Sequence, residues 1–202
     1  MKIKKKLLEE HFSSIKDCKK CSLCKHRTNI VYGKGNPEAK ILLVGEGPGF
    51  FEDKKGLPFV GQAGEKLDEC LVKAGLDENL FYWANIVKCR PWDKVKNRPP
   101  VLEEANQCLP YLYRQIRIVE PSYILCLGKT AASFLLKKEI PSMEGIRKKW
   151  CEKKYPTLQE KVKIARLLVT YHPAYILRNL EKEKDLIDDL CFLGNLLFED
   201  EL

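Results

Sequence analysis

The chain has 202 residues, of which 45% are hydrophobic and 32% charged, and its formal net charge is +8. These values favour a globular fold over disorder, with one domain over residues 1–202 and a sizeable core. No apolar run approaches the roughly 18 residues of a membrane span, and no signal-peptide apolar region is present, so we expect a soluble, cytoplasmic protein without membrane contact. Nine cysteines, an odd number, argue against a disulfide framework.

The positive charge is unevenly distributed along the chain. Residues 1–40 carry eleven Lys/Arg against four Asp/Glu, residues 137–166 carry ten against four, and residues 181–202 carry two against eight. This distribution favours a polyanion, first of all nucleic acid, as the partner of one face. A solvated, lysine-rich surface explains the charge equally well.

Strands and helices are predicted to alternate. Residues 7–15 predict a short amphipathic helix before a cysteine cluster, and apolar runs predict strands at 41–44, 82–87, 123–127 and 167–170. Helical spacing predicts helices at 64–74, 103–119, 128–136 and 181–198, whereas 93–100 reads as a loop and 137–163 as irregular. Such alternation predicts an α/β fold: a three-layer α/β/α sandwich around a central four-stranded parallel sheet.

A glycine-rich turn, Gly45-Glu-Gly-Pro-Gly49, follows the first predicted strand. Glycines allow a tight turn and let a ligand approach main-chain N–H groups, but the spacing matches neither a dinucleotide fingerprint nor a P-loop. Ligands of parallel sheets bind beyond the carboxyl ends of the strands. The polar residues expected at those ends are Glu46, Asn85, Lys88, Lys129 and His172.

The cysteines suggest a second centre. Cys18 and Cys21 form a close pair, and with two distant thiols such as Cys89 and Cys108 they would suit either zinc or an iron–sulfur cluster. Spacing does not choose the distant partners, Cys24 competes for a ligand role, and structural free cysteines remain an alternative. We expect buried free thiols at Cys70, Cys126 and Cys191.

Several motifs occur together in the order of a known family. They are Cys18-x-x-Cys21 with Arg27-Thr-Asn29, Gly33-x-Gly35-Asn36, Gly45-Glu-Gly-Pro-Gly49, Glu52-Asp53 with Gly56-x-Pro58-Phe59-Val60-Gly61-x-Ala63-Gly64, Asn85-Ile-Val-Lys88-Cys89-Arg90-Pro91, and His172-Pro173-Ala174-Tyr175 with Arg178-Asn179. Over nearly its whole length the chain resembles the family 4 uracil-DNA glycosylases, the iron–sulfur branch of the uracil-DNA glycosylase superfamily.

The resemblance implies a cofactor and a reaction. It implies a [4Fe-4S] cluster on Cys18, Cys21, Cys89 and Cys108, with Cys24 outside the ligand set. The implied reaction is hydrolysis of the N-glycosidic bond of uracil in DNA by a monomer, which leaves an abasic site without a lyase step. A non-catalytic iron–sulfur protein that binds nucleic acid or senses redox state, and a zinc-stabilised hydrolase of another substrate, are the alternatives.

The resemblance also implies a role for each site residue. Bond cleavage builds positive charge on the sugar and negative charge on the leaving uracil, so an acid near the sugar and a hydrogen-bond donor near the base are needed. Glu46 would orient water or offset the sugar charge, and His172 would donate to uracil O2. Phe59 would stack on the flipped base and Asn85 would read its Watson–Crick edge, in a pocket walled by Gly45 and Gly47. On residue type alone, a turn acid, a polar loop histidine, a core aromatic and a capping asparagine are the ordinary explanations.

DNA contacts are expected around this pocket. The turn before the predicted helix at 64–74 offers a natural anion site, and two arginines are further candidates: Gly61, Gln62, Ala63, Gly64, Arg90 and Arg178. The stretch 145–166 is longer and more basic than is usual in the family, and it either contacts DNA or forms a mobile insertion. The chain lacks the Arg-Arg-Ile-His sequence of covalently trapping relatives, so we expect turnover.

Overall fold

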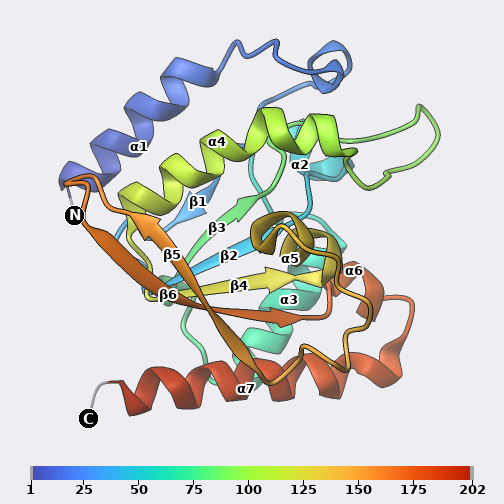
Figure 1. Ribbon diagram of the computed structural model, residues 1–202. Coiled ribbons are helices and arrows are strands. Elements are labelled where there is room, and N and C mark those ends of the chain that lie inside the picture. Colours follow the sequence, from blue (N-terminus) through green and yellow to red (C-terminus); the bar gives the residue numbers. More distant parts are fainter. Residues whose placement is uncertain (1, 201–202) are drawn as a thin grey trace.

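The structure is a computed structural model that describes residues 2–200, so residues 1, 201 and 202 of the expected domain lie outside the described residues. A six-stranded sheet runs through the molecule in the order β1-β3-β2-β4-β6-β5 (Figure 1). The strands are β1 (Lys34–Gly35), β2 (Ile41–Gly45), β3 (Phe81–Asn85), β4 (Tyr123–Leu127), β5 (Trp150–Pro156) and β6 (Val162–Thr170).

The centre of the sheet is parallel. β3, β2, β4 and β6 pair in parallel, which confirms the predicted four-stranded centre, while β1 and β5 add antiparallel edges. The residues of β2, β3 and β4 are all buried, as expected of parallel strands covered on both faces. One contiguous hydrophobic core joins the sheet to its helices.

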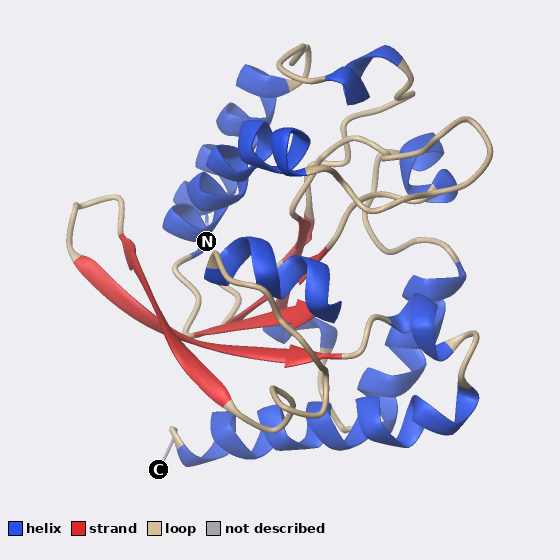
Figure 2. Ribbon diagram, turned by 45° about the vertical axis from the view of Figure 1, so that its right-hand side comes forward, coloured by secondary structure: helices blue, strands red, loops and turns tan. Residues whose placement is uncertain are grey.

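Helices form the two outer layers. α1 (Lys2–Ile15) packs on α4 (Leu102–Val119), and together with α5 (Gly128–Leu136) they lie on one side of the sheet; α3 (Gln62–Lys73) and α7 (Glu183–Glu199) pack together on the other (Figures 1 and 2). The short helices α2 (Phe50–Lys55) and α6 (Pro173–Ile176) follow β2 and β6. The three-layer prediction is therefore confirmed. None of the helices within residues 2–200 has the length and apolar character needed to cross a membrane.

The prediction of an irregular segment at 137–163 was wrong over its second half. Residues 150–156 form β5, which pairs with a β6 that begins five residues earlier than expected, at Val162. Only Tyr155 in β5 is buried, because this edge strand covers little of the core. The apolar signal was therefore too weak to mark a strand.

Candidate active site

Three predicted pocket residues meet at the carboxyl ends of β2 and β3. Gly45 lies opposite Asn85 in the parallel register, and a Cβ at Gly45 would overlap the Asn85 side-chain oxygen and lie 2.8 Å from Phe59 Cζ. Only glycine leaves room for both neighbours. Beyond the strands, the Ile86 N–H donates to the Gly45 carbonyl (2.9 Å) and the Val87 N–H to the Glu46 carbonyl (3.2 Å), so the two segments that follow β2 and β3 stay paired past Asn85.

Phe59 is held in an unusual backbone conformation. Its φ of +53° lies in the left-handed region, which costs a non-glycine residue roughly 1–2 kcal/mol. Its ring is buried and tilted against Trp83 at 5.4 Å between centroids, and the Lys34 ammonium donates to its carbonyl at 3.3 Å. A Cβ at Gly64 would overlap the Phe59 carbonyl, so the first turn of α3 packs directly on this backbone.

The Glu52 carboxylate joins the two loops that bound the pocket. Its Oε1 accepts hydrogen bonds from the N–H groups of Val60 and Gly61, both at 3.0 Å, and its Oε2 accepts one from Gly49 at 3.1 Å. The glycine-rich turn is thereby tied to the segment that carries Phe59. In the sequence Glu52 is recognisable only as part of a motif, because its contacts with three separate loop positions leave no local signal.

The half-buried Glu46 follows Gly45. Burial raises the pKa of its carboxyl, and a hydrogen bond with Thr130 at the start of α5 acts in the opposite direction. Gly47 sits equally tightly in the turn, since a Cβ there would come within 2.7 Å of Val87 Cγ2. Glu46 therefore lies between the ends of β2 and β4, beside the Gly45, Phe59 and Asn85 group.

His172 stands just past the end of β6 as the cap of α6. Its Nδ1 accepts a hydrogen bond from the Ala174 N–H at 3.1 Å, so a neutral ring carries its proton on Nε2. Burial, assisted by the positive charge of Arg178, lowers the pKa of His172 to about 4, while the charge of Glu52 opposes the shift. A Cβ at Gly128 would lie 3.2 Å from the Cβ of His172, which places His172 against the end of β4.

The side chains of two polar residues expected at the strand ends, Lys88 and Lys129, do not join the pocket residues. The side chain of Lys88 is buried, where its Nζ donates to the Asn85 carbonyl at 2.9 Å and to Gln115 Oε1 at 2.6 Å, and burial lowers its pKa to about 8. Lys88 therefore fixes the main chain at Asn85 from within the core. Lys129 is exposed, and its Nζ contacts the Pro141 carbonyl at 3.5 Å. Arg178 is exposed beyond α6.

The four cysteines of the implied ligand set line one cavity of about 20 Å³, together with Cys24. Three of their sulfurs already have polar neighbours: the Lys88 N–H donates to Cys108 at 3.2 Å, Arg27 donates to Cys89 at 3.6 Å, and the Tyr111 hydroxyl lies 3.2 Å from Cys18. Burial raises the pKa of the Cys89 thiol to about 12 and that of Cys108 to about 11.

Within residues 2–200 no three candidate ligands lie close enough together to hold a single metal ion.

The three cysteines that were expected to be buried free thiols differ in their exposure. Cys70 and Cys126 are buried free thiols as predicted, but the prediction for Cys191 was wrong, because Cys191 is exposed on the outer side of α7. Apolar neighbours in sequence did not reveal which side of the helix it occupies.

A second cavity, of about 280 Å³, lies beside the cysteines and is lined largely by basic and aromatic side chains: Ser22, Leu23, Lys25, His26, Arg90, Trp92 and Arg98. Arg98 is paired with the buried Glu104 at 2.7 Å. The Arg90 guanidinium instead lies over the Trp92 ring at 4.9 Å and the Phe50 ring at 5.3 Å, and its Nε donates to Asn97. The indole N–H of Trp92 is buried without a partner among the described residues.

Comparison with known proteins gives consistent matches. Residues 32–191 match the family described as "Uracil DNA glycosylase superfamily". The chain is 39% identical over 186 residues to a type-4 uracil-DNA glycosylase of Thermotoga maritima, across 91% of this chain and 90% of that protein. It is 38% identical over 192 residues to a type-4 uracil-DNA glycosylase of Archaeoglobus fulgidus, across 94% and 92%. A protein of the same name from Sulfurisphaera tokodaii is 40% identical over 186 residues, across 90% and 81%.

Proposed function

This chain belongs to the type-4 uracil-DNA glycosylases of the uracil-DNA glycosylase superfamily, and we propose that it flips uracil out of DNA and hydrolyses its N-glycosidic bond, leaving an abasic site. The observation that carries this proposal is the meeting of Gly45, Phe59 and Asn85 at one sheet edge, beside Glu46 and His172. The same proposal includes one catalytic domain, acting as a cytoplasmic monomer on uracil-containing DNA.

The pocket would bind the flipped base through shape and hydrogen bonds. The Asn85 amide would donate to uracil O4 and accept from N3–H, and the Phe59 ring would stack on the base. Gly45 would leave room for the Asn85 and Phe59 side chains that contact the base, and Gly47 would let the turn pack closely against Val87 in the pocket wall. A fixed, buried recognition group is favourable here because the base gives up stacking and pairing on leaving the duplex.

His172 would stabilise the departing uracil. With Nδ1 already accepting from Ala174, the neutral ring presents an Nε2–H donor, which would bond uracil O2 as negative charge develops there. The lowered pKa keeps the ring neutral at pH 7, so the group that would meet uracil O2 is a neutral N–H donor. The ring therefore acts as a fixed donor.

Glu46 would act on the sugar side. Its carboxylate would orient the attacking water and offset the positive charge of the sugar in the transition state. The raised pKa follows from the partial burial that also strengthens this electrostatic effect. A chain without an amine nucleophile at this position fits simple hydrolysis, which supports a monofunctional enzyme.

We also propose that Cys18, Cys21, Cys89 and Cys108 hold a [4Fe-4S] cluster. The donor set fits, because these thiols share one cavity and three of them have N–H or O–H neighbours of the kind that tune cluster sulfurs. When bound, the cluster would join three segments far apart in sequence through metal–thiolate bonds.

Contacts to the DNA backbone would flank the pocket. At the first turn of α3 the N–H groups of Gln62 and Ala63 have no intrahelical partner and would face a phosphate. The Gly61 N–H is already used by Glu52, so Gly61 and Gly64 would contribute shape rather than hydrogen bonds. Arg90 would act from the basic cavity and Arg178 from beyond α6. Family membership favours catalysis over a purely DNA-binding or redox-sensing protein.

The test is gel-based cleavage of single- and double-stranded uracil oligonucleotides by anaerobically purified protein. We expect alkali-sensitive sites at uracil only, and a loss of release in Glu46→Ala, Asn85→Ala and His172→Ala with folding unchanged. Cytosine-containing oligonucleotides and Glu9→Ala, an exposed residue of α1, are the controls. An absence of release from every uracil substrate by brown, folded wild-type protein would overturn the proposal.

A further inference from the structure

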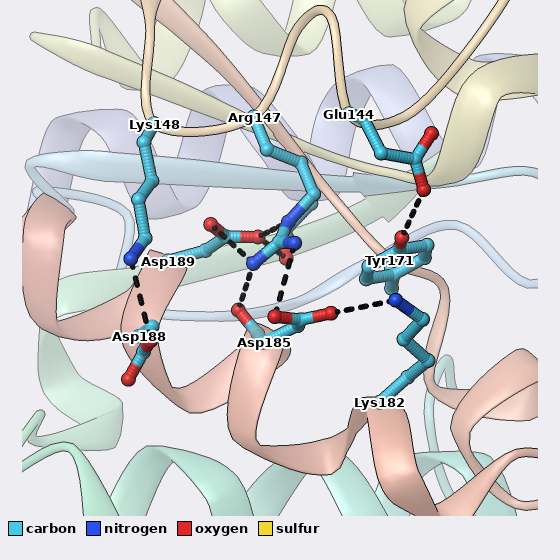
Figure 3. A network of polar contacts seen from close by, with 9 residues as sticks. Glu144, Arg147, Lys148, Tyr171, Lys182, Asp185, Asp188 and Asp189 are labelled. Carbon is cyan, nitrogen blue, oxygen red and sulfur yellow. Dashed lines mark hydrogen bonds and ion pairs between the residues drawn. The ribbon is translucent and has the colours of Figure 1, made fainter.

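The segment 144–147 contacts the loop that carries His172. The segment begins one residue before the stretch 145–166, which the sequence predicts to be either a DNA contact or a mobile insertion. Figure 3 shows Arg147 reaching between Asp185 and Asp189 of α7, with Tyr171 close by. The described contacts of this segment point into the protein, toward the residues that precede His172.

Arg147 is the centre of this network. Its Nε donates to Asp189 Oδ2 at 2.7 Å, and one terminal nitrogen donates to the Asp185 carbonyl at 2.7 Å while the other pairs with Asp185 Oδ1 at 3.2 Å. The side chains of Arg147 and Asp189 are only 12% and 5% exposed. A planar guanidinium that bonds several acceptors at once fixes their relative positions more firmly than a lysine could.

This network holds the two residues that directly precede His172 in the sequence. The Thr170 hydroxyl donates to the same Asp189 oxygen at 2.6 Å, and the Tyr171 ring lies beneath the Arg147 guanidinium at 4.9 Å. The Tyr171 hydroxyl donates to Glu144 at 2.9 Å. The last residue of β6 and the residue after it are therefore both restrained immediately before His172.

The restraint continues past His172. Tyr171 stacks on Tyr175 of α6 with an interplanar angle of 12° and 5.3 Å between centroids. In α6, the Ala174 N–H donates to His172 Nδ1, the bond that sets the tautomer of the imidazole. The chain on both sides of His172 is thus anchored to Arg147: Tyr171 directly, Thr170 through Asp189, and Tyr175 through Tyr171.

We propose that Arg147 is a positioning residue that holds the His172 loop, so that the imidazole donor is aimed at the base. This rests on the proposed function. A tether of the segment to α7 alone would not need Thr170 and Tyr171, because the surface pair of Lys148 with Asp188 at 3.3 Å already makes that connection.

The experiment compares Arg147→Met and Arg147→Lys with Lys148→Met, which removes the surface pair from the same segment, all in protein that retains its cluster. Single-turnover uracil release should fall about 10- to 100-fold in Arg147→Met, the range for a displaced catalytic group, and recover in part in Arg147→Lys. Affinity for an oligonucleotide with a non-cleavable uracil analogue should stay within about twofold of wild type. Lys148→Met should match wild type in both.

A double-mutant cycle separates positioning from general support. If Arg147 acts through His172, then adding Arg147→Met to His172→Ala should lower release by less than about threefold further. The proposal would be overturned if Arg147→Met released uracil at the wild-type rate. It would also be overturned if Arg147→Met lowered release by the same factor in the His172→Ala background as in the wild-type protein. Should Arg147→Met fail to fold, Glu144→Ala and Thr170→Val remove one contact each and should show smaller losses with the same non-additivity.

A readout without catalysis keeps this inference distinct from the proposed function. Hydrogen exchange at the Ala174 amide, which donates to the His172 ring, should become faster in Arg147→Met and stay unchanged in Lys148→Met. If the wild-type protein released no uracil, the proposed function would fail while this measurement still tested the positioning role. Unchanged exchange in Arg147→Met would count against it.

Discussion

Gly45 lies opposite Asn85 in the parallel pairing of β2 and β3, so close that a Cβ on Gly45 would overlap the Asn85 side-chain oxygen. Two adjacent strand ends thus create a space that only glycine can border. The amide of Asn85 and the ring of Phe59 share that space.

Substituting this glycine tests the pocket. Gly45→Ala should push Asn85 and Phe59 apart and lower single-turnover uracil release by about 100-fold or more, because the recognition groups are displaced from the base. Gly194→Ala is the matched control, since its Cβ in α7 would meet only Leu76 Cδ2, at 3.4 Å. Equal rates for the two variants would show that Gly45 does not border the base.

Glu52→Gln tests the link between the two pocket loops. An amide cannot accept at both ends, so at least one of the three N–H groups would lose its acceptor, at a cost of about 1–3 kcal/mol. Denaturant unfolding of the cluster-loaded protein measures the free energy of unfolding. Glu9→Gln on the exposed side of α1 should leave the free energy of unfolding unchanged, and an equally stable Glu52→Gln would refute the link between the two loops.

The lowered pKa of His172 predicts a pH dependence of stability. Below its ordinary value of 6.5, an unfolded chain protonates this ring, whereas the folded ring stays neutral until about pH 4. The contribution of His172 is therefore complete above pH 6.5 and is lost toward pH 4, by up to about 1.4 kcal/mol per pH unit.

His172→Gln isolates this effect. His11 has a pKa lowered to about 4 by burial, so it contributes in the same pH window. The difference between wild type and His172→Gln in unfolding free energy, measured from about pH 4.5 to about pH 7.5, removes the share of His11. We expect that difference to grow with pH up to about 6.5 and then level off; a constant difference would contradict the burial effect.

The basic cavity predicts salt-dependent DNA binding. Lys25→Met and Arg90→Met should weaken binding of uracil-containing and uracil-free oligonucleotides alike, and each should reduce the slope of log affinity against log salt by about 1 if it meets a phosphate. Lys5→Met on the exposed face of α1 is the charge-matched control. A loss confined to uracil-containing DNA would place these residues in base recognition instead.

Serine variants test the proposed ligand set. Cys108→Ser should lose visible absorbance and iron content together with thermal stability, because one thiolate ligand is missing. Cys24→Ser, in the same cavity but outside the proposed set, and Cys191→Ser, on the surface, should keep both. Iron loss in Cys24→Ser with retention in Cys108→Ser would reassign the ligands.

Much of the fold follows from local pattern. The strand at 123–127 and the helix at 128–136 have the predicted limits, and Gly75, just past α3, adopts a φ of +70°, the left-handed conformation in which a glycine commonly ends a helix. The edge strands escaped prediction because β1 has two residues and β5 is mostly exposed. Apolar residues recur at regular spacing only where one face of a helix or strand packs against the core.

The sequence by itself determined the order of elements, the family and the set of residues that carry the chemistry, because motifs and periodicity lie within short stretches of chain. Only the tertiary structure decided how those residues are held. Lys88 is buried beneath Asn85, Glu52 accepts three N–H groups, and Arg147 anchors the chain on both sides of His172. Such contacts join segments from different elements, and the packing of those elements brings the atoms together.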